Sequence, residues 1–267
     1  VLESTDKLRW THINTLTTPE TFGYMWECPD LFCLDGQWYL AVSPQGIQCQ
    51  NIYGCGYFAV YGDWRGECTL GEFHEANFGF DYYAPQSFVD ENGRRIQIGW
   101  MGMPDADYGN APTVAHGWQH CFTVPRLLTK GENGTLLQNP VPELDAQRGP
   151  ARKLADDTER SISPCFDLTA APAGDFALTV ARGVELVYTE QDSTCVLQFT
   201  DPAQASGRTQ RRTKLFAPCR SVRVVGDRSS LEIFLNDGAA VFSTRYYPAA
   251  GDVAVKISGT DALVYSL

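Results

Sequence analysis

Short runs of β-branched and aromatic residues recur along the chain, and turns rich in Gly, Asp, Asn and Pro separate them. Helix signals are almost absent. The turn sequences LDGQ, DENGRR and GENGT join neighbouring runs as hairpins. Strands at such regular spacing are typical of a sandwich, a barrel or propeller blades. The strands expected in the first half are Gln37–Ser43, Gly56–Tyr61, Asp81–Val89, Arg95–Met101 and His120–Leu128.

A break in the pattern comes at NPVPELDAQRGPARK, residues 139–153, where three prolines and a charged, helix-compatible patch mark a linker. We therefore expect one domain over 1–140, a linker over 141–152 and a second domain over 153–267. Strand signals resume after the linker, and LNDGAAVF reads as a hairpin. Eight strands over about 115 residues suit an antiparallel sandwich. These strands are Phe176–Val180, Val184–Tyr188, Cys195–Thr200, Ser221–Val225, Ser230–Leu235, Ala240–Thr244, Asp252–Ser258 and Ala262–Leu267.

The charge balance limits the partners. The formal net charge is −11 and the sequence pI is about 4.8, so no basic stripe is available to meet nucleic acid or an anionic membrane. The short basic cluster RTQRRTK reads as a solvated loop or an edge strand. No apolar run reaches about 18 residues, so no membrane span is predicted.

Nine cysteines are scattered along the chain without a CxxC pair. This spacing is unlike a disulfide framework, and it predicts reduced thiols in a cytoplasmic protein. The first residues, VLESTDKLRW, lack Met and any signal-peptide pattern, and they read as mid-domain sequence. We therefore expect a fragment, a processed chain or a trimmed chain.

A glutamate lies in the apolar stretch GYMWECPDLF, where ionising a carboxyl group is unfavourable. Glu27 has the surroundings of a general acid/base, because apolar neighbours keep a carboxyl group protonated closer to working pH. The alternative is a strand glutamate that points to solvent, and the pattern alone leaves both open. Pro29 is expected to end strand pairing just beyond Glu27.

Three further positions are candidates for sugar binding. Asp81 and Tyr83 are two residues apart, so on one strand they would share a face, although an ordinary alternating strand explains them equally. Gln86 follows a proline that is expected to bend it towards the same pocket. Trp100 offers a flat face to a sugar, although a tryptophan in such a run is more often core. PDADYGN, residues 104–110, is expected to form a mobile acidic turn near the pocket mouth, and no metal site is predicted.

Several motifs, in order, resemble the family 32 glycoside hydrolases, which include invertases, sucrose-6-phosphate hydrolases, levanases and inulinases. WECPD looks like the family's Glu-Cys-Pro motif, and NFGFDYYAPQSF looks like its Asp-x-Tyr-Ala motif. RRIQIGWMG, HGWQHCFTVPRLLT and LLQNPVPEL are similar to the segments that close the catalytic domain, and GDRSSLEIFLNDG to the signature of the C-terminal sandwich. The resemblance covers nearly the whole chain. It implies an all-β fold, a five-bladed β-propeller followed by a β-sandwich, with no cofactor.

The resemblance also gives the candidate residues roles. It favours Glu27 as the general acid/base of a retaining β-fructofuranosidase, with Asp81, Tyr83, Gln86 and Trp100 binding the fructose-containing sugar. Retaining hydrolysis needs two carboxyl groups about 5–5.5 Å apart. The family's nucleophilic aspartate lies in an Asn-Asp-Pro-Asn-Gly stretch, and a further aspartate lies in an Arg-Asp-Pro stretch; this sequence contains neither.

We therefore expect a partial propeller, consisting of the end of the third blade and two further blades, that is inactive alone. Its open flank would be covered by self-association or by an N-terminal half. Three hypotheses follow: a β-fructosidase piece active only with that half, a non-catalytic carbohydrate-binding or association module, and a structural remnant. The sequence does not choose between sucrose, its 6-phosphate and short fructans.

Overall fold

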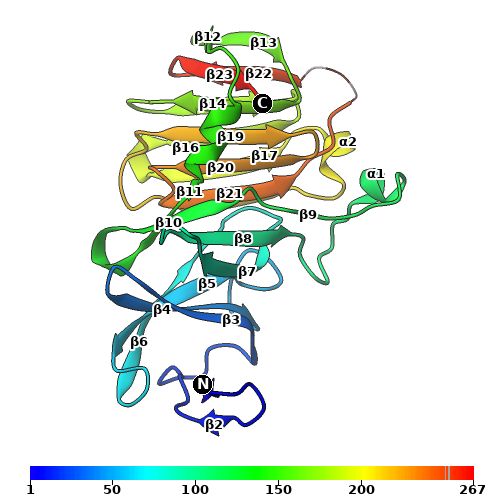
Figure 1. Cartoon of the computed structure of the whole chain (residues 1–267). Coiled ribbons are helices and arrows are strands. Elements are labelled where there is room, and N and C mark those ends of the chain that lie inside the picture. Colours follow the sequence, from blue (N-terminus) through cyan, green and yellow to red (C-terminus); the bar gives the residue numbers. More distant parts are fainter. Residues whose placement is uncertain (250, 252) are drawn as a thin grey trace.

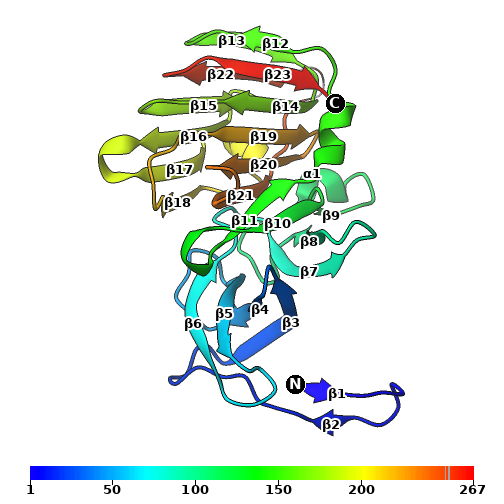
Figure 2. The same ribbon diagram turned by 60° about the vertical axis from the view of Figure 1, so that its left-hand side comes forward.

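The computed structural model describes residues 1–249, 251 and 253–267. Strands dominate it, and they form two parts that lie one above the other in Figures 1 and 2. The lower part consists of two small sheets and a two-stranded hairpin, and the upper part consists of two larger sheets. The prediction of an all-β chain with a partial propeller followed by a β-sandwich is confirmed.

A four-stranded and a five-stranded antiparallel sheet form the two blades of the lower part. In the first blade the strand order is β3-β4-β5-β6, and in the second it is β11-β10-β8-β7, with β9 pairing to β8. A two-stranded hairpin, β1 with β2, precedes them and lies at the end farthest from the sandwich (Figure 1). Their bounds are β1 Leu2–Glu3, β2 Thr11–His12, β3 Met25–Leu34, β4 Gln37–Gln45, β5 Gly56–Gly62, β6 Cys68–Glu75, β7 Tyr83–Val89, β8 Arg95–Met101, α1 Ala111–Val114, β9 Cys121–Phe122, β10 Arg126–Lys130, η1 Glu132–Gly134 and β11 Leu136–Pro140.

The upper part is a sandwich of two six-stranded antiparallel sheets. Their orders are β12-β23-β14-β19-β20-β21 and β13-β22-β15-β16-β17-β18. The bounds are η2 Pro142–Gln147, β12 Arg152–Leu154, β13 Thr158–Ile162, β14 Cys165–Ala170, β15 Phe176–Val180, β16 Val184–Thr189, η3 Glu190–Asp192, β17 Thr194–Phe199, α2 Pro202–Ala205, β18 Gln210–Lys214, β19 Val222–Asp227, β20 Ser230–Leu235, β21 Ala240–Arg245, β22 Val253–Ser258 and β23 Ala262–Ser266.

Most of the predicted strands are present, with local differences. The prediction of eight strands in the second part is wrong, because the described residues form twelve there and β12, β13 and β14 were not predicted. The basic cluster contributes β18, which is an edge strand as expected. The predicted run His120–Leu128 is two strands, because the chain leaves the sheet between β9 and β10 around Pro125. Asp252, the predicted start of one strand, lies outside the described residues, and β22 begins at Val253. The boundaries 1–140, 141–152 and 153–267 stay a prediction; η2 lies between β11 and β12.

Four apolar clusters of described residues hold these sheets, the smallest of them formed by Val225, Phe234 and Val241. One fills the sandwich. A second, which includes Phe32 and Tyr57 of the first blade and Leu128 and Leu136 of the second, joins the two blades. A third covers the other face of the first blade, where Leu16 and Phe22 of the N-terminal segment pack against it. Several of its rings are only partly buried, namely Phe22, Trp26, Trp38, Trp64 and Phe73.

The second blade and the sandwich meet through buried ion pairs. Arg126 of β10 donates to Glu232 of β20 at 2.6 Å, and both side chains are buried. Arg208, in the segment before β18, binds Asp81 in the same way at 2.7 Å. The backbones also approach closely: a Cβ on Gly238 would lie 2.0 Å from the carbonyl oxygen of Gln138. Such contacts fix the two parts rigidly against each other.

Candidate active site

Glu27 lies on β3, the strand at the inner edge of the first blade. Its Cα faces Ser43 of β4, but the register then slips, so that two residues oppose one before pairing resumes at Asp30. The residue in this bulge, Cys28, has a φ of 48°. The prediction that Pro29 ends strand pairing is wrong. An edge strand tolerates a proline at a bulge, and β3 continues to Leu34.

Tyr83 is the direct partner of Glu27. The phenolic Oη of Tyr83 donates to Glu27 Oε2 at 2.8 Å, which joins the first strand of the second blade to the first strand of the first. The Tyr83 side chain is buried and Glu27 is partly buried. Burial, and in smaller part the hydrogen bond to Glu27, raises the pKa of Tyr83. The phenol therefore stays protonated and remains a donor at neutral pH.

Trp100 lies beside this pair. It faces Tyr83 directly across β7 and β8, and directly opposed residues point to the same side of a sheet. Its ring makes an edge-on contact with His120 at 4.7 Å between centroids. Burial lowers the pKa of His120, and the charge of Arg245 adds to this. Trp100 is thus close to the candidate acid, and its sugar-binding role stays a prediction.

Gln86 is turned towards the bulge of β3. Its side-chain Nε2 donates to the carbonyl oxygen of Cys28 and to that of Pro85, each at 3.0 Å. The side chain is exposed. Its observed partners are backbone groups next to Glu27.

Asp81 is in a different place from the one expected. The strand begins at Tyr83, so Asp81 precedes it, and the inference that the two share one strand face is wrong. Its carboxylate is buried and accepts two hydrogen bonds from Arg208, each 2.7 Å long, and one from the backbone N–H of Arg245 at 2.7 Å. The structure therefore places Asp81 in the contact with the sandwich, and Tyr83 alone faces Glu27.

Tyr53, near Glu27, carried no sequence signal. The ring of Tyr53 lies 6.0 Å from that of Tyr83, and its Oη donates to Asp105 Oδ2 at 2.7 Å. This hydrogen bond raises the pKa of Tyr53 to about 12. Asp105 belongs to the acidic turn, which lies beside the site as expected. Tyr53 follows β4 in an irregular loop, where neither periodicity nor a motif marks it.

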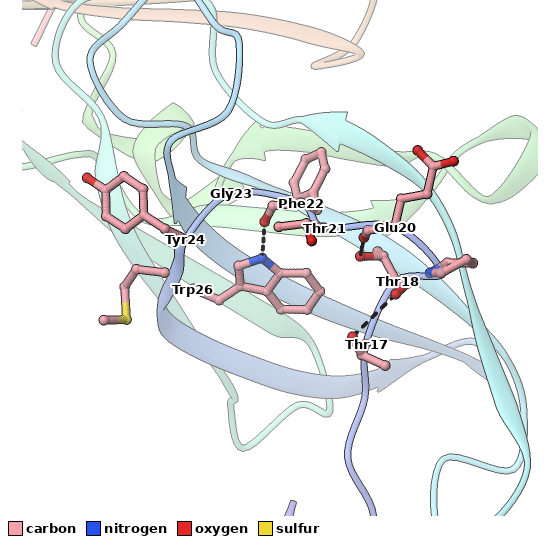
Figure 3. Close-up of a pocket in the computed structure, with 10 residues that line it drawn as sticks. Thr17, Thr18, Glu20, Thr21, Phe22, Gly23, Tyr24 and Trp26 are labelled. Atoms are coloured by element: carbon pink, nitrogen blue, oxygen red, sulfur yellow. Dashed lines mark hydrogen bonds between the residues drawn. The ribbon is translucent and has the colours of Figure 1, made fainter.

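Two hollows lie elsewhere on the surface. Residues 17–26 line one of about 410 Å³, shown in Figure 3, where the indole Nε1 of Trp26 donates to the carbonyl oxygen of Phe22 at 2.6 Å. Trp26 also stacks on Phe58 of the first blade, with 5.3 Å between centroids. It belongs to the outer face of that blade, and strand alternation directs Glu27 to the other side.

A larger hollow of about 1000 Å³ lies between the blades and the sandwich. Its walls include Tyr61 and Glu75 of the first blade and Phe216 of the sandwich. Burial raises the pKa of Glu75 to about 7. Glu27 lines neither hollow.

The described residues bring no group of three or more His, Cys, Asp or Glu side chains into a metal-binding arrangement. All nine cysteines are free, which agrees with the expected reduced thiols. The cytoplasmic location inferred from them stays a prediction. None of the described helices has the length and apolar character needed to cross a bilayer.

Comparisons with known proteins agree with this architecture. Residues 1–140 match the model of the glycosyl hydrolases family 32 N-terminal domain, and residues 135–263 match the model of the family 32 C terminal. The chain is 36% identical over 97% of its length to a sucrose-6-phosphate hydrolase of Bacillus subtilis, and 35% identical over 98% to one of Staphylococcus xylosus. It spans 58% and 57% of those two proteins.

Solved structures show the same fold. The chain superimposes over its whole length on a Bombyx mori GH32 beta-fructofuranosidase with a TM-score of 0.86 and 26% identity, covering 59% of that chain. It superimposes on a sucrose-6-phosphate hydrolase from Lactobacillus gasseri with a TM-score of 0.89 and 23% identity, again covering 59%.

Proposed function

This chain belongs to glycosyl hydrolase family 32, and from that premise we propose that it is part of a retaining β-fructofuranosidase. Its substrate would be sucrose, sucrose 6-phosphate or a short fructan. The relatives named above are sucrose-6-phosphate hydrolases and a beta-fructofuranosidase, which supports the fructoside class. The chain spans less than two thirds of those proteins, so the activity is proposed for the assembled enzyme.

Glu27 acts as the general acid/base in this proposal. The observation that supports it is the hydrogen bond from the buried Tyr83 to Glu27, formed where the inner strands of two blades meet. A general acid must first protonate the leaving oxygen and then activate water, so its carboxyl group has to be held at a defined position. Tyr83 holds one carboxylate oxygen, and the other is left for the sugar. Trp100 and Tyr53 border the place where the sugar ring would lie.

The nucleophile is proposed to come from another polypeptide segment. The sequence contains no Asn-Asp-Pro-Asn-Gly stretch, and Asp81, the acidic residue nearest to Tyr83 in sequence, is engaged by Arg208. Loss of one member of a catalytic pair removes most of the rate. Hydrolysis should therefore require a polypeptide that carries the N-terminal blades.

The aromatic outer face of the first blade is the proposed docking face for those blades. Trp26, Trp38 and Phe73 remain partly exposed there, and propeller blades bury such faces against their neighbours. Without the N-terminal blades this face should drive self-association. Light scattering tests this: a monodisperse monomer of 29.6 kDa would contradict it.

The activity test compares the chain alone with the chain mixed with the N-terminal blades of the Bacillus subtilis relative. Each sample receives sucrose, and released fructose is measured, with Glu27→Gln as the control. Release that needs both the added blades and Glu27 supports the proposal. Glu27-dependent release by the chain alone would show that this chain contains its own nucleophile. Sugar binding without release from the mixture would favour the non-catalytic binding module.

A further inference from the structure

The inner strands of the two blades contain the same local arrangement. Residues 27–29, Glu-Cys-Pro, and residues 83–85, Tyr-Ala-Pro, each consist of a candidate site residue, a residue with positive φ and a proline. The φ values of the central residues are 48° and 49°. In each strand the register slips at this point, so both form bulges. A bulge redirects the side chain beside it, and a non-glycine residue at positive φ persists only where its surroundings hold it.

Each bulge is held by a residue of the other blade. Gln86, directly after the second bulge, donates to the carbonyl oxygen of Cys28 at 3.0 Å. In return, Ser43 of the first blade accepts a hydrogen bond from the backbone N–H of Ala84 at 3.2 Å. Ser43 is fully buried and lies directly opposite Glu27 on β4. The contacts are reciprocal, so neither bulge can shift without disturbing the other.

Asp30 makes a third link at the point where β3 regains its register. Its Oδ2 accepts from the backbone N–H of Ser87 at 2.9 Å and from the Ser87 hydroxyl at 2.5 Å. Arg95 of β8 in turn donates to that hydroxyl at 3.0 Å. A carboxylate that accepts two donors from one residue fixes both distance and orientation.

We propose that Asp30, Ser43 and Gln86 are positioning residues, which lock the two bulges together and thereby set the hydrogen bond from Tyr83 to Glu27. For Gln86 this role replaces the expected contact with the sugar. The catalytic meaning of the arrangement rests on the proposed function, whereas the geometry can be tested without turnover.

The test uses the whole chain with 3-fluorotyrosine at position 83, because the ¹⁹F resonance reports on the hydrogen bond of that phenol. Glu27→Gln gives the resonance position that corresponds to a lost carboxylate partner. We expect Asp30→Ala to move the resonance at least halfway to that position. Asp30→Asn retains an oxygen that can accept from Ser87, so it should stay close to the unmodified chain. The matched control is Asp192→Ala, which removes an acceptor for the N–H of Thr194 in the sandwich.

An unchanged resonance in a folded Asp30→Ala chain would overturn the proposal, as would failure of Asp30→Asn to restore it. If Asp30→Ala does not fold, Gln86→Ala and Ser43→Ala replace it. Both should shift the resonance, and no shift in either would equally overturn the proposal.

Kinetics of the assembled enzyme provide a second measurement. There, Asp30→Ala should lower kcat about tenfold or more with little change in KM, and Asp30→Asn should recover it. If no assembly releases fructose, the proposed function fails, while the ¹⁹F result still decides whether these residues position Glu27 and Tyr83.

Discussion

Replacing Arg126 with Met should destabilise the chain by an amount that grows with pH. Arg126 is fully buried between the rings of Tyr82 and Phe234, so a methionine retains the apolar packing. What it removes is the charge that faces Glu232. The guanidinium makes two hydrogen bonds to that carboxylate, at 2.6 and 3.2 Å, one to Ser243 at 2.7 Å and one to Gln138 at 2.9 Å.

The magnitude follows from the cost of keeping Glu232 neutral. Without its partner, the buried carboxyl group would fold protonated, which costs about 1.36 kcal/mol for each pH unit above its ordinary pKa of 4.5. The pH-dependent part of the difference is therefore at most about 3.4 kcal/mol at pH 7 and at most about 0.7 kcal/mol at pH 5, because the raised pKa of Glu232 means that the unmodified chain bears part of the same cost. The first value lies within the roughly 3–5 kcal/mol typical of breaking a buried pair.

The sign of the pH dependence can be worked out from Glu232. Burial raises the pKa of Glu232, and Arg126 opposes that rise, so removing Arg126 raises the pKa further. A carboxyl group whose folded-state pKa exceeds its unfolded value contributes stability below the unfolded value, and this is lost as pH rises through the folded value. The variant therefore loses stability over a wider pH range than the unmodified chain. The difference between them must therefore increase from about pH 5 to about pH 7.

Urea unfolding followed by tryptophan fluorescence at the two pH values measures this difference. The double variant Arg126→Met with Glu232→Gln is the control, since it has no buried carboxyl group left to titrate. The destabilisation of this double variant should be the same at both pH values. An equal destabilisation by Arg126→Met at both pH values would refute the reasoning.

Three other outcomes follow from the described contacts. Asp81→Asn should lower stability by about 3 kcal/mol, because it leaves a buried arginine uncompensated; an unchanged melting curve with weakened sugar binding would instead restore Asp81 as a sugar ligand. Gly238→Ala should cost at least about 2 kcal/mol more than Gly36→Ala, since both glycines have positive φ but only the first meets a backbone oxygen. Equal melting temperatures for these two variants would show that the two parts do not approach so closely. In the native chain the thiol of Cys28 should react faster with a disulfide reagent than that of Cys55, because Cys28 is exposed. Burial raises the pKa of both thiols, for Cys55 to about 12. Fewer than nine reactive thiols after unfolding without reductant would contradict the reduced state.

Local signals explain why much of the fold could be predicted from the sequence. Arg95–Met101, Phe176–Val180 and Ser230–Leu235 have the predicted bounds, because an alternating or β-branched run between turn residues is a property of the run itself. Cys68–Glu75 was missed. It is the outer edge strand of the first blade, and Gly71 and charged residues interrupt its alternation of apolar and polar positions. Its existence as a strand depends on pairing with β5, which the local sequence does not reveal.

The candidate site was predictable as a set of residue types but not as a geometry. Glu27 and Tyr83 were selected separately, and their contact requires two register slips that no alternation pattern shows. Asp81 was misplaced because the two-residue spacing assumes a strand that begins only at Tyr83. Its true partner, Arg208, is 127 positions away in the sequence. Long-range pairing of this kind is what single-sequence reasoning cannot supply.

The sandwich also bears on the site, although it lies far from Glu27 in sequence. Arg208 fixes Asp81 two residues before β7, and Ser243 of β21 bonds both Asn77 and Arg126 of the blades. The start of β7 is therefore set from the sandwich side, and β7 in turn holds the bulge beside Glu27. Hydrogen bonds thus connect the sandwich to the second blade and the second blade to the first. Weakening the contact between the sandwich and the second blade should therefore disturb the hydrogen bond from Tyr83 to Glu27 before either blade unfolds. In this way the sandwich helps to orient the proposed general acid.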